Sequence, residues 1–189
     1  MMLGDTTRSA SVGRISTRRA YTGRIISVDV DKVEFPDGSV GELEMVRHPG
    51  ASAVVPLFAV GKDPQVLLIR QYRYAANGYV YEIPAGRLDP EESPGVCANR
   101  ELKEETGYSA ATVRLLTTIF TTPGFTDERI HIFLAEGLMA GRSEREPDEF
   151  LELYPVPLSK AVGMVRAGKI TDAKTAIGLL LTYLSHNPE

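Results

Sequence analysis

Residues 86–108 read GRLDPEESPGVCANRELKEETGY and combine a turn, a helix and a cluster of acidic side chains in one short segment. Ser93 suits the N-cap position, and Pro94 suits the first helical position, whose N–H has no partner within the helix. Gly107 suits the left-handed residue that ends many helices. The segment therefore predicts a helix from Pro94 to Thr106.

Acidic side chains gather on one side of this predicted helix. On a helical wheel, an arc of about 100° beside the apolar side holds Glu101, Glu104 and Glu105. Carboxylates three and four residues apart repel each other, so this cluster disfavours stability unless a cation lies among them. Carboxylate oxygens in this number suit Mg²⁺ or Mn²⁺, which keep waters and substrate phosphates in their coordination shells. The helix therefore indicates a phosphate-linked reaction.

The spacing of this segment resembles the Nudix box, the signature of hydrolases that cleave nucleoside diphosphates linked to another moiety. Gly86, Glu92 and residues 100–107 fill the box positions, so both glycines and every polar position are present. Tyr108 departs from the pattern, because the family usually has an aliphatic residue there. In the family the arginine of the box, here Arg100, orients a box glutamate by a salt bridge, and Glu92 is expected to assist through water or through Arg100. The alternative, an acidic solvated surface helix, would rarely carry Gly, Glu and Arg at these offsets.

Length and composition exclude several other classes of protein. The 189 residues suffice for one domain with a sizeable core plus a small appendage. A net charge of −4 argues against binding to nucleic acid or a membrane surface, which normally needs a basic patch. A single cysteine, Cys97, allows no intrachain disulfide, and three scattered histidines form no recognisable zinc site. With no apolar run of membrane-spanning length and no signal-peptide core, we expect a cytoplasmic protein.

The domain organisation follows from shifts in composition along the chain. Residues 1–18 are rich in Ser, Thr, Arg and Gly without a hydrophobic period, and we expect a mobile tail there. Residues 19–48 contain β-like runs around the turn 36–38 and predict a small antiparallel sheet or hairpin. Its unpaired edges need a partner surface, for which a second copy of the chain is one candidate. Residues 49–189 form the expected main domain.

The order of elements in the main domain predicts an α/β fold. Strands are expected over 52–60, 65–73, 79–86, 113–120 and 129–135, and C-terminal helices over 159–167 and 172–185. This order predicts a mixed sheet with helices on its faces. It resembles the Nudix α/β/α sandwich. The β-rich N-terminal region resembles the one that family members acting on ADP-ribose and related sugar nucleotides use to form an intertwined dimer, which implies a homodimer through residues 19–48.

The resemblance implies a set of metal ligands. Glu101 and Glu105 are the leading ligands, with Glu104 close behind. The backbone carbonyl before the box glycine, here that of Ala85, is a metal ligand in the related enzymes. We expect Mg²⁺ or Mn²⁺, because a divalent cation stabilises the charge on phosphoryl oxygens and lowers the pKa of an attacking water.

The attacking water also needs a general base, and box glutamates are poor bases when they bind metal. An acidic run at 144–149 follows the strand 129–135, where the resembling ADP-ribose enzymes place an extra metal ligand and the catalytic base. Glu149 best matches the ligand position, and Glu146 or Asp148 could be the base. Acidic loop residues are more often simply solvated, and both interpretations stay open. The catalytic candidates are Glu105, Glu149 and Glu146.

Other residues are candidates for binding the substrate. Arg70 and Arg73 alternate with apolar neighbours, so one of them is expected to clamp phosphate; Arg73 matches the family arginine better. Glu82, in a segment typical of the ADP-ribose branch, is expected to hydrogen-bond adenine or ribose, or else to be a solvent-facing strand residue. Pro123 and Gly124 resemble the loop that separates Nudix subfamilies. The proline stands fifteen residues past Tyr108, a spacing associated with ADP-ribose pyrophosphatases, although a Pro-Gly pair is also an ordinary turn.

These features predict a pyrophosphatase that splits ADP-ribose into AMP and ribose 5-phosphate with a metal-activated water. An alternative is a pyrophosphatase for another nucleotide sugar such as GDP-mannose, because those relatives share the N-terminal region. A third hypothesis is a sensor that binds ADP-ribose without cleaving it. Such sensors often have eroded box glutamates, whereas the glutamates of this box are intact.

Overall fold

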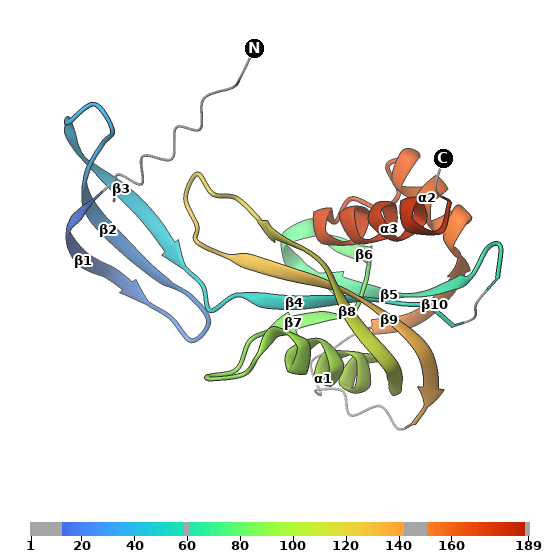
Figure 1. The fold of residues 1–189 in the computed structure, drawn as a ribbon. Coiled ribbons are helices and arrows are strands. Elements are labelled where there is room, and N and C mark those ends of the chain that lie inside the picture. Colours follow the sequence, from blue (N-terminus) through green and yellow to red (C-terminus); the bar gives the residue numbers. More distant parts are fainter. Residues whose placement is uncertain (1–12, 59–60, 142–150, 188–189) are drawn as a thin grey trace, which may run out of the picture. The chain divides into compact units, whose positions relative to one another are not determined.

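The computed structural model describes residues 13–58, 61–141 and 151–187. The chain folds as two compact units. The first unit comprises Met1–His48 and Thr122–Glu128, and the second comprises Pro49–Thr121 and Arg129–Glu189. Figure 1 colours the chain by sequence, so the first unit is found by its blue strands β1, β2 and β3.

The first unit contains a three-stranded antiparallel sheet in the order β1-β2-β3, which confirms the expected small sheet. Its strands are β1 Arg14–Thr22, β2 Ser27–Glu34 and β3 Val40–Arg47. Strand β1 begins inside the segment 1–18 that was expected to be a tail, so that boundary is wrong from Arg14 onward. All nine residues of β1 are exposed, and the strand is held by backbone pairing to β2. It therefore lacks the alternation of apolar residues that reveals a strand in a sequence.

A guanidinium joins the sheet of this unit to the loop Thr122–Glu128. Arg47 Nε donates to Asp29 Oδ2 at 3.1 Å, and Nη2 of the same arginine donates to Asp31. Its Nη1 donates to Asp127 Oδ2 at 3.1 Å. Asp29 and Asp31 are both buried, and a buried carboxylate is tolerated when it is paired. Arg47 therefore pairs with both buried carboxylates of β2, to which Arg19 and Thr17 also donate.

The second unit contains two sheets. A four-stranded mixed sheet has the order β7-β4-β9-β8 with β4 and β9 parallel, and a three-stranded antiparallel sheet has the order β10-β5-β6. The strands are β4 Ala51–Pro56, β5 Gln65–Arg73, β6 Gly78–Glu82, β7 Ala85–Arg87, β8 Tyr108–Phe120, β9 Arg129–Ala140 and β10 Leu151–Pro157, with a 3₁₀ turn η1 at Tyr74–Ala76. The expected mixed sheet is confirmed, whereas β10 was not predicted. Strands β8 and β9 are longer than expected, because they continue to pair with each other beyond their apolar segments.

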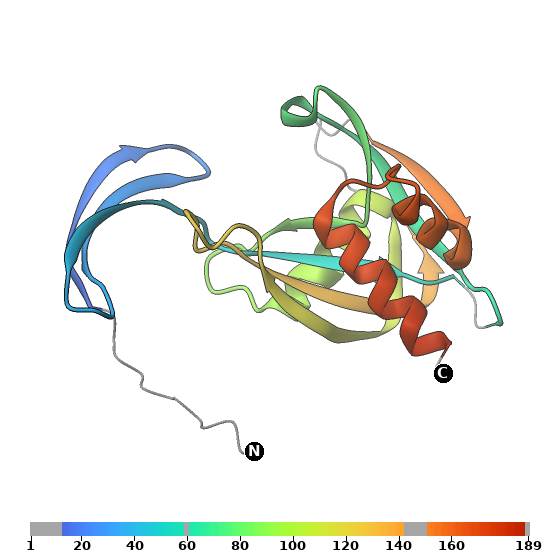
Figure 2. The same cartoon turned by 90° about the horizontal axis from the view of Figure 1, so that it is seen from above.

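Helices cover both faces of the mixed sheet, as expected for an α/β/α sandwich. They are α1 Pro94–Thr106, α2 Leu158–Arg166 and α3 Ala173–His186. Helix α1 lies on one side of the strands, and α2 and α3 lie on the other (Figure 1); the view from above shows α3 crossing over the strands (Figure 2). The bounds of α1 match the prediction. Ser93 occupies the N-cap position without a side-chain cap hydrogen bond, and Gly107 ends the helix with φ 78°.

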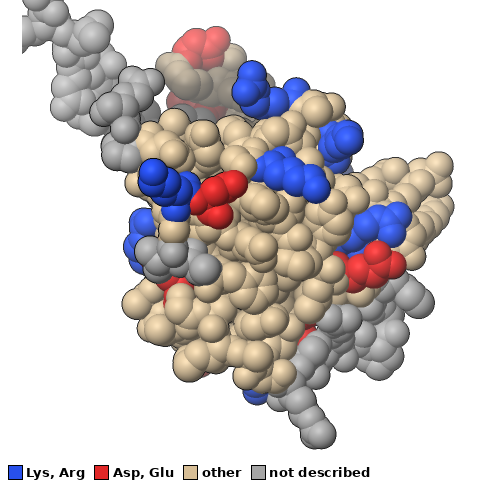
Figure 3. Space-filling model, turned by 90° about the vertical axis from the view of Figure 1, so that its right-hand side faces the viewer, with Lys and Arg blue, Asp and Glu red and all other residues tan. Residues whose placement is uncertain are grey.

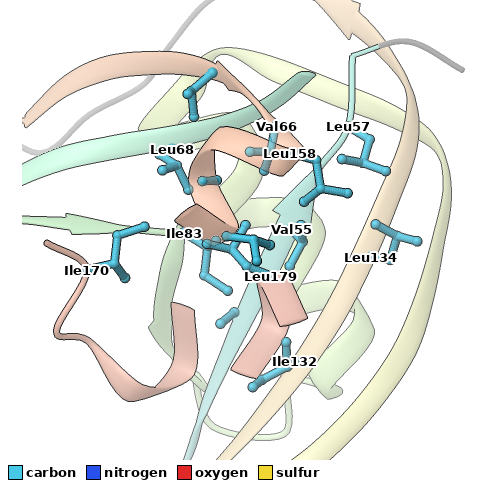
Figure 4. Close-up of a cluster of buried hydrophobic side chains, with 14 of the residues drawn as sticks. Val55, Leu57, Val66, Leu68, Ile83, Ile132, Leu134, Leu158, Ile170 and Leu179 are labelled. Carbon is cyan, nitrogen blue, oxygen red and sulfur yellow. The ribbon is translucent and has the colours of Figure 1, made fainter. Parts of the chain in front are cut away.

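The alternation of β4 explains why it packs against helices on both sides. Val55 belongs to the larger core with α2 and α3, whereas Val54 belongs to a smaller core with α1. Figure 4 shows the larger core, in which Val55 lies near Leu179 of α3; Leu68 of β5 belongs to the same core. Because successive residues of a strand point to opposite faces, a strand that is buried on both faces is largely apolar. Ser52 is a polar residue of β4, and its hydroxyl donates to Pro94 O at 2.8 Å. All six residues of β4 are buried.

The surface of the molecule carries charges of both signs. On the face shown in Figure 3, Lys and Arg side chains lie singly or beside Asp and Glu, separated by uncharged residues. These charges therefore act as separate local groups on that face. None of the helices in the described ranges is long and apolar enough to cross a membrane.

Two helical glycines provide a test of the packing between α3 and the sheet. A Cβ on Gly178 of α3 would meet Val55 Cγ2 at 2.8 Å and Ile132 Cγ2 at 3.2 Å, whereas a Cβ on Gly163 of α2 would meet nothing within 4 Å. We expect Gly178→Ala to lower the free energy of unfolding by about 1–3 kcal/mol, because overpacking outweighs the better helix propensity of alanine. Gly163→Ala is the matched control and should raise it by about 0.5–1 kcal/mol. Urea unfolding of both variants measures the difference, and equal effects would contradict the close packing.

Candidate active site

Helix α1 is held in place by its apolar side. Ala98 and Leu102 are fully buried and pack with Val54 and Phe133 of the sheet. Because residues three and four apart share a helix face, this packing fixes the direction of the adjacent acidic side. Tyr108, where the family pattern has an aliphatic residue, packs against the same small core. The aromatic ring therefore takes the packing role of the usual residue.

Two carboxylates of α1 lie against consecutive residues of strand β7. Glu105, with a relative exposure of 2%, accepts a hydrogen bond from Ala85 N through Oε2 at 3.0 Å. The carboxylate of Glu101 lies against Gly86, where a Cβ would overlap it. Strand β7 is itself fixed by antiparallel pairing with β4, in which Ala85 lies opposite Ala53. The fold thus brings Glu101 and Glu105 to one short stretch of backbone, and this approach requires glycine at position 86.

Arg100 donates hydrogen bonds to acidic side chains before and within α1. Its Nε and Nη2 donate to Glu92 Oε1 and Oε2, both at 2.9 Å, and Nη2 also donates to Arg87 O at 3.0 Å. Its Nη1 donates to Glu101 Oε1 at 2.5 Å and to Glu104 Oε2 at 2.9 Å. The expected salt bridge from this arginine to a box glutamate is therefore confirmed. The hydrogen bonds from Arg100 lower the pKa of Glu92 from its ordinary 4.5 to about 2.

The donor chemistry of this site fits a divalent cation. The groups around Ala85 and Gly86 are carboxylate and carbonyl oxygens, the ligands that Mg²⁺ and Mn²⁺ prefer. In the described ranges, no three His, Cys, Asp or Glu side chains stand together as a ready metal site. Arg100 explains part of this, because it draws the carboxylates of Glu101 and Glu104 to itself. The ligand set Ala85, Glu101, Glu104 and Glu105 therefore stays a prediction whose chemistry the site fits.

A buried thiol lies beneath the same turn. Cys97 is fully buried, and its Sγ lies 3.3 Å from Arg87 O and 3.6 Å from Gly86 O. Burial raises the pKa of this thiol to about 12. Since the thiolate is the form that reacts and binds metal, Cys97 serves as a packed, hydrogen-bonded side chain.

A second charged group lines a pocket at the ends of β5 and β6. The pocket has a volume of about 340 Å³, and its walls include Arg73 of β5, Val80 and Glu82 of β6, and Thr171, Asp172 and Lys174 at the start of α3. Arg73 Nε donates to Glu82 Oε1 at 2.7 Å, and Nη2 donates to Glu82 Oε2 at 2.9 Å. Lys174 Nζ donates to the same Oε2 at 2.6 Å. Arg73 and Glu82, expected as substrate residues, are thus brought together in one pocket.

The electrostatics of the pocket connect it to α1. Burial raises the pKa of Glu82, but hydrogen bonds and charges from Arg73 and Lys174 outweigh it, and the pKa is lowered. The pKa of Arg73 is raised, chiefly by its hydrogen bond with Glu82 and further by the charge of Glu105. Arg73 therefore lies within electrostatic reach of a box carboxylate.

The remaining predicted residues fall into three groups. Arg70 lies three positions from Arg73 on β5, so it faces the opposite side of the strand; it pairs with Glu152 at 3.2 Å and lies over the ring of Tyr79. Pro123 and Gly124 belong to the first unit, in the loop Thr122–Glu128. The predicted loop acids Glu146, Asp148 and Glu149 lie outside the described residues. The functions proposed for these residues stay predictions.

Sequence reasoning missed Lys174. The motif Asp172-Ala173-Lys174-Thr175 did identify the start of a helix, and Asp172 Oδ2 accepts from Thr175 N at 3.0 Å as an N-cap. The contact between Lys174 and Glu82, however, joins residues 92 positions apart. A single sequence carries no local signal for such a contact.

The ionic contact of Glu92 predicts a pH dependence of stability. Its pKa in the folded protein, about 2, lies below the ordinary 4.5, so the contact with Arg100 stabilises the fold fully above pH 4.5 and is lost as the pH falls toward 2. Glu92→Gln removes the titrating carboxylate, so the variant should lose less stability than the unmodified chain as the pH falls. Urea unfolding midpoints from pH 7 to pH 3 measure it. A variant that loses stability as steeply as the unmodified chain would contradict the ionic contact.

Two known proteins are similar to this chain over most of its length. The ADP-ribose pyrophosphatase of Bacillus subtilis (strain 168) is 40% identical over 167 residues, which cover 87% of this chain and 89% of the relative. The GDP-mannose pyrophosphatase of Salmonella paratyphi B (strain ATCC BAA-1250 / SPB7) is 38% identical over 156 residues, covering 75% of this chain and 80% of the relative.

A solved structure and a family model match as well. The crystal structure of an ADP compounds hydrolase superposes with a TM-score of 0.77 and 25% sequence identity, covering 92% of this chain and 94% of the other. The family model of the NUDIX domain matches residues 47–175, which include α1 and the pocket formed by β5, β6 and the start of α3. With most of its length matched by this model, the chain belongs to the Nudix family.

Proposed function

We propose that this chain hydrolyses the diphosphate bond of ADP-ribose to give AMP and ribose 5-phosphate. The observation that carries the proposal is the placement of Glu101 and Glu105 against Ala85 and Gly86, within electrostatic reach of Arg73. Oxygen ligands beside an arginine are the groups that a diphosphate with its metal ion requires. The names of the related ADP-ribose pyrophosphatase and ADP compounds hydrolase support this choice of substrate.

The proposed cofactor is Mg²⁺ or Mn²⁺, held by the carbonyl of Ala85 and the carboxylates of Glu101 and Glu105, with Glu104 as a further ligand. When bound, the cation supplies charge stabilisation on the phosphoryl oxygens and a lower pKa for a bound water. Arg100 holds the carboxylates of Glu101 and Glu104 in place. Metal binding would therefore have to draw these two carboxylates from the guanidinium toward the cation.

Arg73 is proposed to bind the diphosphate. The two carboxylate oxygens of Glu82 accept hydrogen bonds from Nε and Nη2 of Arg73. This leaves Nη1 of the arginine to meet a phosphate oxygen. The arginine side chain is 42% exposed, although the carboxylate that holds it is buried. Glu82 is therefore proposed to orient Arg73 rather than to bind adenine or ribose itself.

The reaction is a hydrolysis at phosphorus. The oxygen of water forms a new bond to one phosphorus, the bridging P–O bond breaks, and the bridging oxygen leaves on the other phosphate. A carboxylate takes the proton of the water, and the candidates are Glu146, Asp148 and Glu149, with Glu105 as a further catalytic candidate.

A second substrate is favoured by the relative named GDP-mannose pyrophosphatase, since one diphosphate site suits several nucleotide sugars.

The first unit is proposed to pair two copies of the chain. Strand β1 is an edge strand with all nine residues exposed, and it carries the large apolar side chains Ile15 and Tyr21. An exposed edge with apolar side chains is a surface that readily pairs with another strand.

Sedimentation of charged variants tests the homodimer. We expect the unmodified chain to sediment as a dimer and Ile15→Lys to sediment mainly as a monomer at the same concentration, because a lysine on an edge strand opposes pairing. Ala167→Lys adds the same charge at an exposed residue of the second unit and should leave the dimer intact. A monomer for the unmodified chain, or a dimer for Ile15→Lys, contradicts the proposed role of β1.

Release of AMP from ADP-ribose in Mg²⁺ tests the proposed reaction. Glu105→Gln should lower kcat by about 100-fold or more, because it removes a proposed ligand charge next to the diphosphate. Glu91→Gln changes an exposed carboxylate in the turn before α1 and serves as the matched control with kcat near that of the unmodified chain. Similar turnover by Glu105→Gln would sink the assigned role of this residue.

Two further measurements separate the alternatives. Turnover of GDP-mannose and ADP-ribose under the same conditions ranks the two substrates, and a higher kcat/KM for GDP-mannose would replace the proposed one. Tight binding of ADP-ribose in Mg²⁺ without any AMP would instead identify a sensor. Chelation by EDTA should abolish turnover, and added Mg²⁺ or Mn²⁺ should restore it.

A further inference from the structure

We propose that Lys174 is a positioning residue that fixes Glu82 and, through it, directs Arg73 toward the diphosphate. This inference rests on the proposed function, because it assigns a role within the same site. Lys174 comes from α3, on the other side of the sheet from the box helix α1. It adds a residue from the C-terminal helix to a site otherwise built from β5, β6, β7 and α1.

The geometry places Lys174 between two carboxylates. Its Nζ lies 2.6 Å from Glu82 Oε2 and 3.0 Å from Asp172 Oδ1, and the side chain is only 12% exposed. Glu82 Oε2 also accepts from Arg73 Nη2 at 2.9 Å, so the two cations share one oxygen. Charges of alternating sign thus form a row from Arg73 through Glu82 and Lys174 to Asp172.

Burial of Glu82 makes the second cation important. The residue is 3% exposed, and a carboxylate removed from water is costly unless it is paired and hydrogen-bonded. Without Lys174, Arg73 would be the only one of these two cations paired with the buried carboxylate. A rotation of the carboxylate toward water would then move the guanidinium as well. With Lys174 in place, Oε2 is anchored from the side of α3, and Oε1 faces Arg73 Nε. The direction of Arg73 Nη1 therefore depends on a lysine that need not touch the substrate.

The fold does not depend on Lys174 for the attachment of α3. Ile83 N donates to Thr175 Oγ1 at 2.8 Å, which joins the end of β6 to the helix. Asp172 caps the helix through Thr175 N. Leu179 packs in the larger core. None of these contacts uses the lysine side chain, so a variant that replaces it is expected to fold.

The experiment compares Lys174→Met with Lys160→Met, which removes the same charge from an exposed position of α2. We expect Lys174→Met to raise KM for ADP-ribose about tenfold while kcat stays within about threefold, the pattern of lost binding that is uniform between substrate and transition state. Calorimetry with a non-hydrolysable methylene analogue of ADP-ribose in Mg²⁺ should show a similar weakening of Kd. Lys174→Arg should retain most of the affinity, and Lys160→Met should match the unmodified chain.

A double-mutant cycle tests whether Lys174 acts through Glu82. If it does, Lys174→Met should change the Kd of the analogue by less than about twofold in a Glu82→Gln background. Independent, additive effects would overturn the inference, as would an unchanged KM and Kd in Lys174→Met. An unmodified chain that binds the analogue but releases no AMP from ADP-ribose would refute the proposed reaction, while the calorimetric cycle would still decide the role of Lys174.

Discussion

The carboxylate of Glu101 occupies the space beside Gly86 that a side chain would fill, and the site is built around this contact. It requires α1 to lie close to β7, which the apolar side of the helix ensures by packing on β4 and β9. The neighbouring contact from Ala85 N to Glu105 then holds a second carboxylate at the same backbone. A larger residue at position 86 would displace the carboxylate of Glu101 from the strand.

Two arginines repeat one arrangement in different parts of the site. Arg100 holds Glu92 by two nitrogens, and Arg73 holds Glu82 by two nitrogens. In each pair the planar guanidinium matches the two oxygens of one carboxylate, which fixes direction as well as distance. One pair lies beside the carboxylates of α1, and the other orients the arginine that is proposed to bind a phosphate oxygen. The same local chemistry thus organises both the acidic and the basic halves of the site.

Much of the fold was predictable where local signals mark an element. Pro94 and Gly107 bracket α1, so its bounds could be read from the sequence. Strand β1 was not predicted at its observed start, because its nine residues are all exposed and show no apolar alternation. Strand β10 carries two prolines, which a strand tolerates at the edge of a sheet, and its position beside β5 makes it such an edge. The salt bridge of Arg100 was expected from the resemblance to the Nudix box, whereas the contact of Lys174 depends on how distant segments pack.

The buried thiol beneath the site has a practical consequence for future labelling of this protein. Burial raises the pKa of the Cys97 thiol to about 12, so the ionised form that thiol reagents attack is scarce at neutral pH. The chain has one cysteine, so a new cysteine on its surface would react selectively while the native one is kept. Fluorescent or spin probes can therefore be attached without disturbing the hydrogen bonds that Cys97 makes under the box turn.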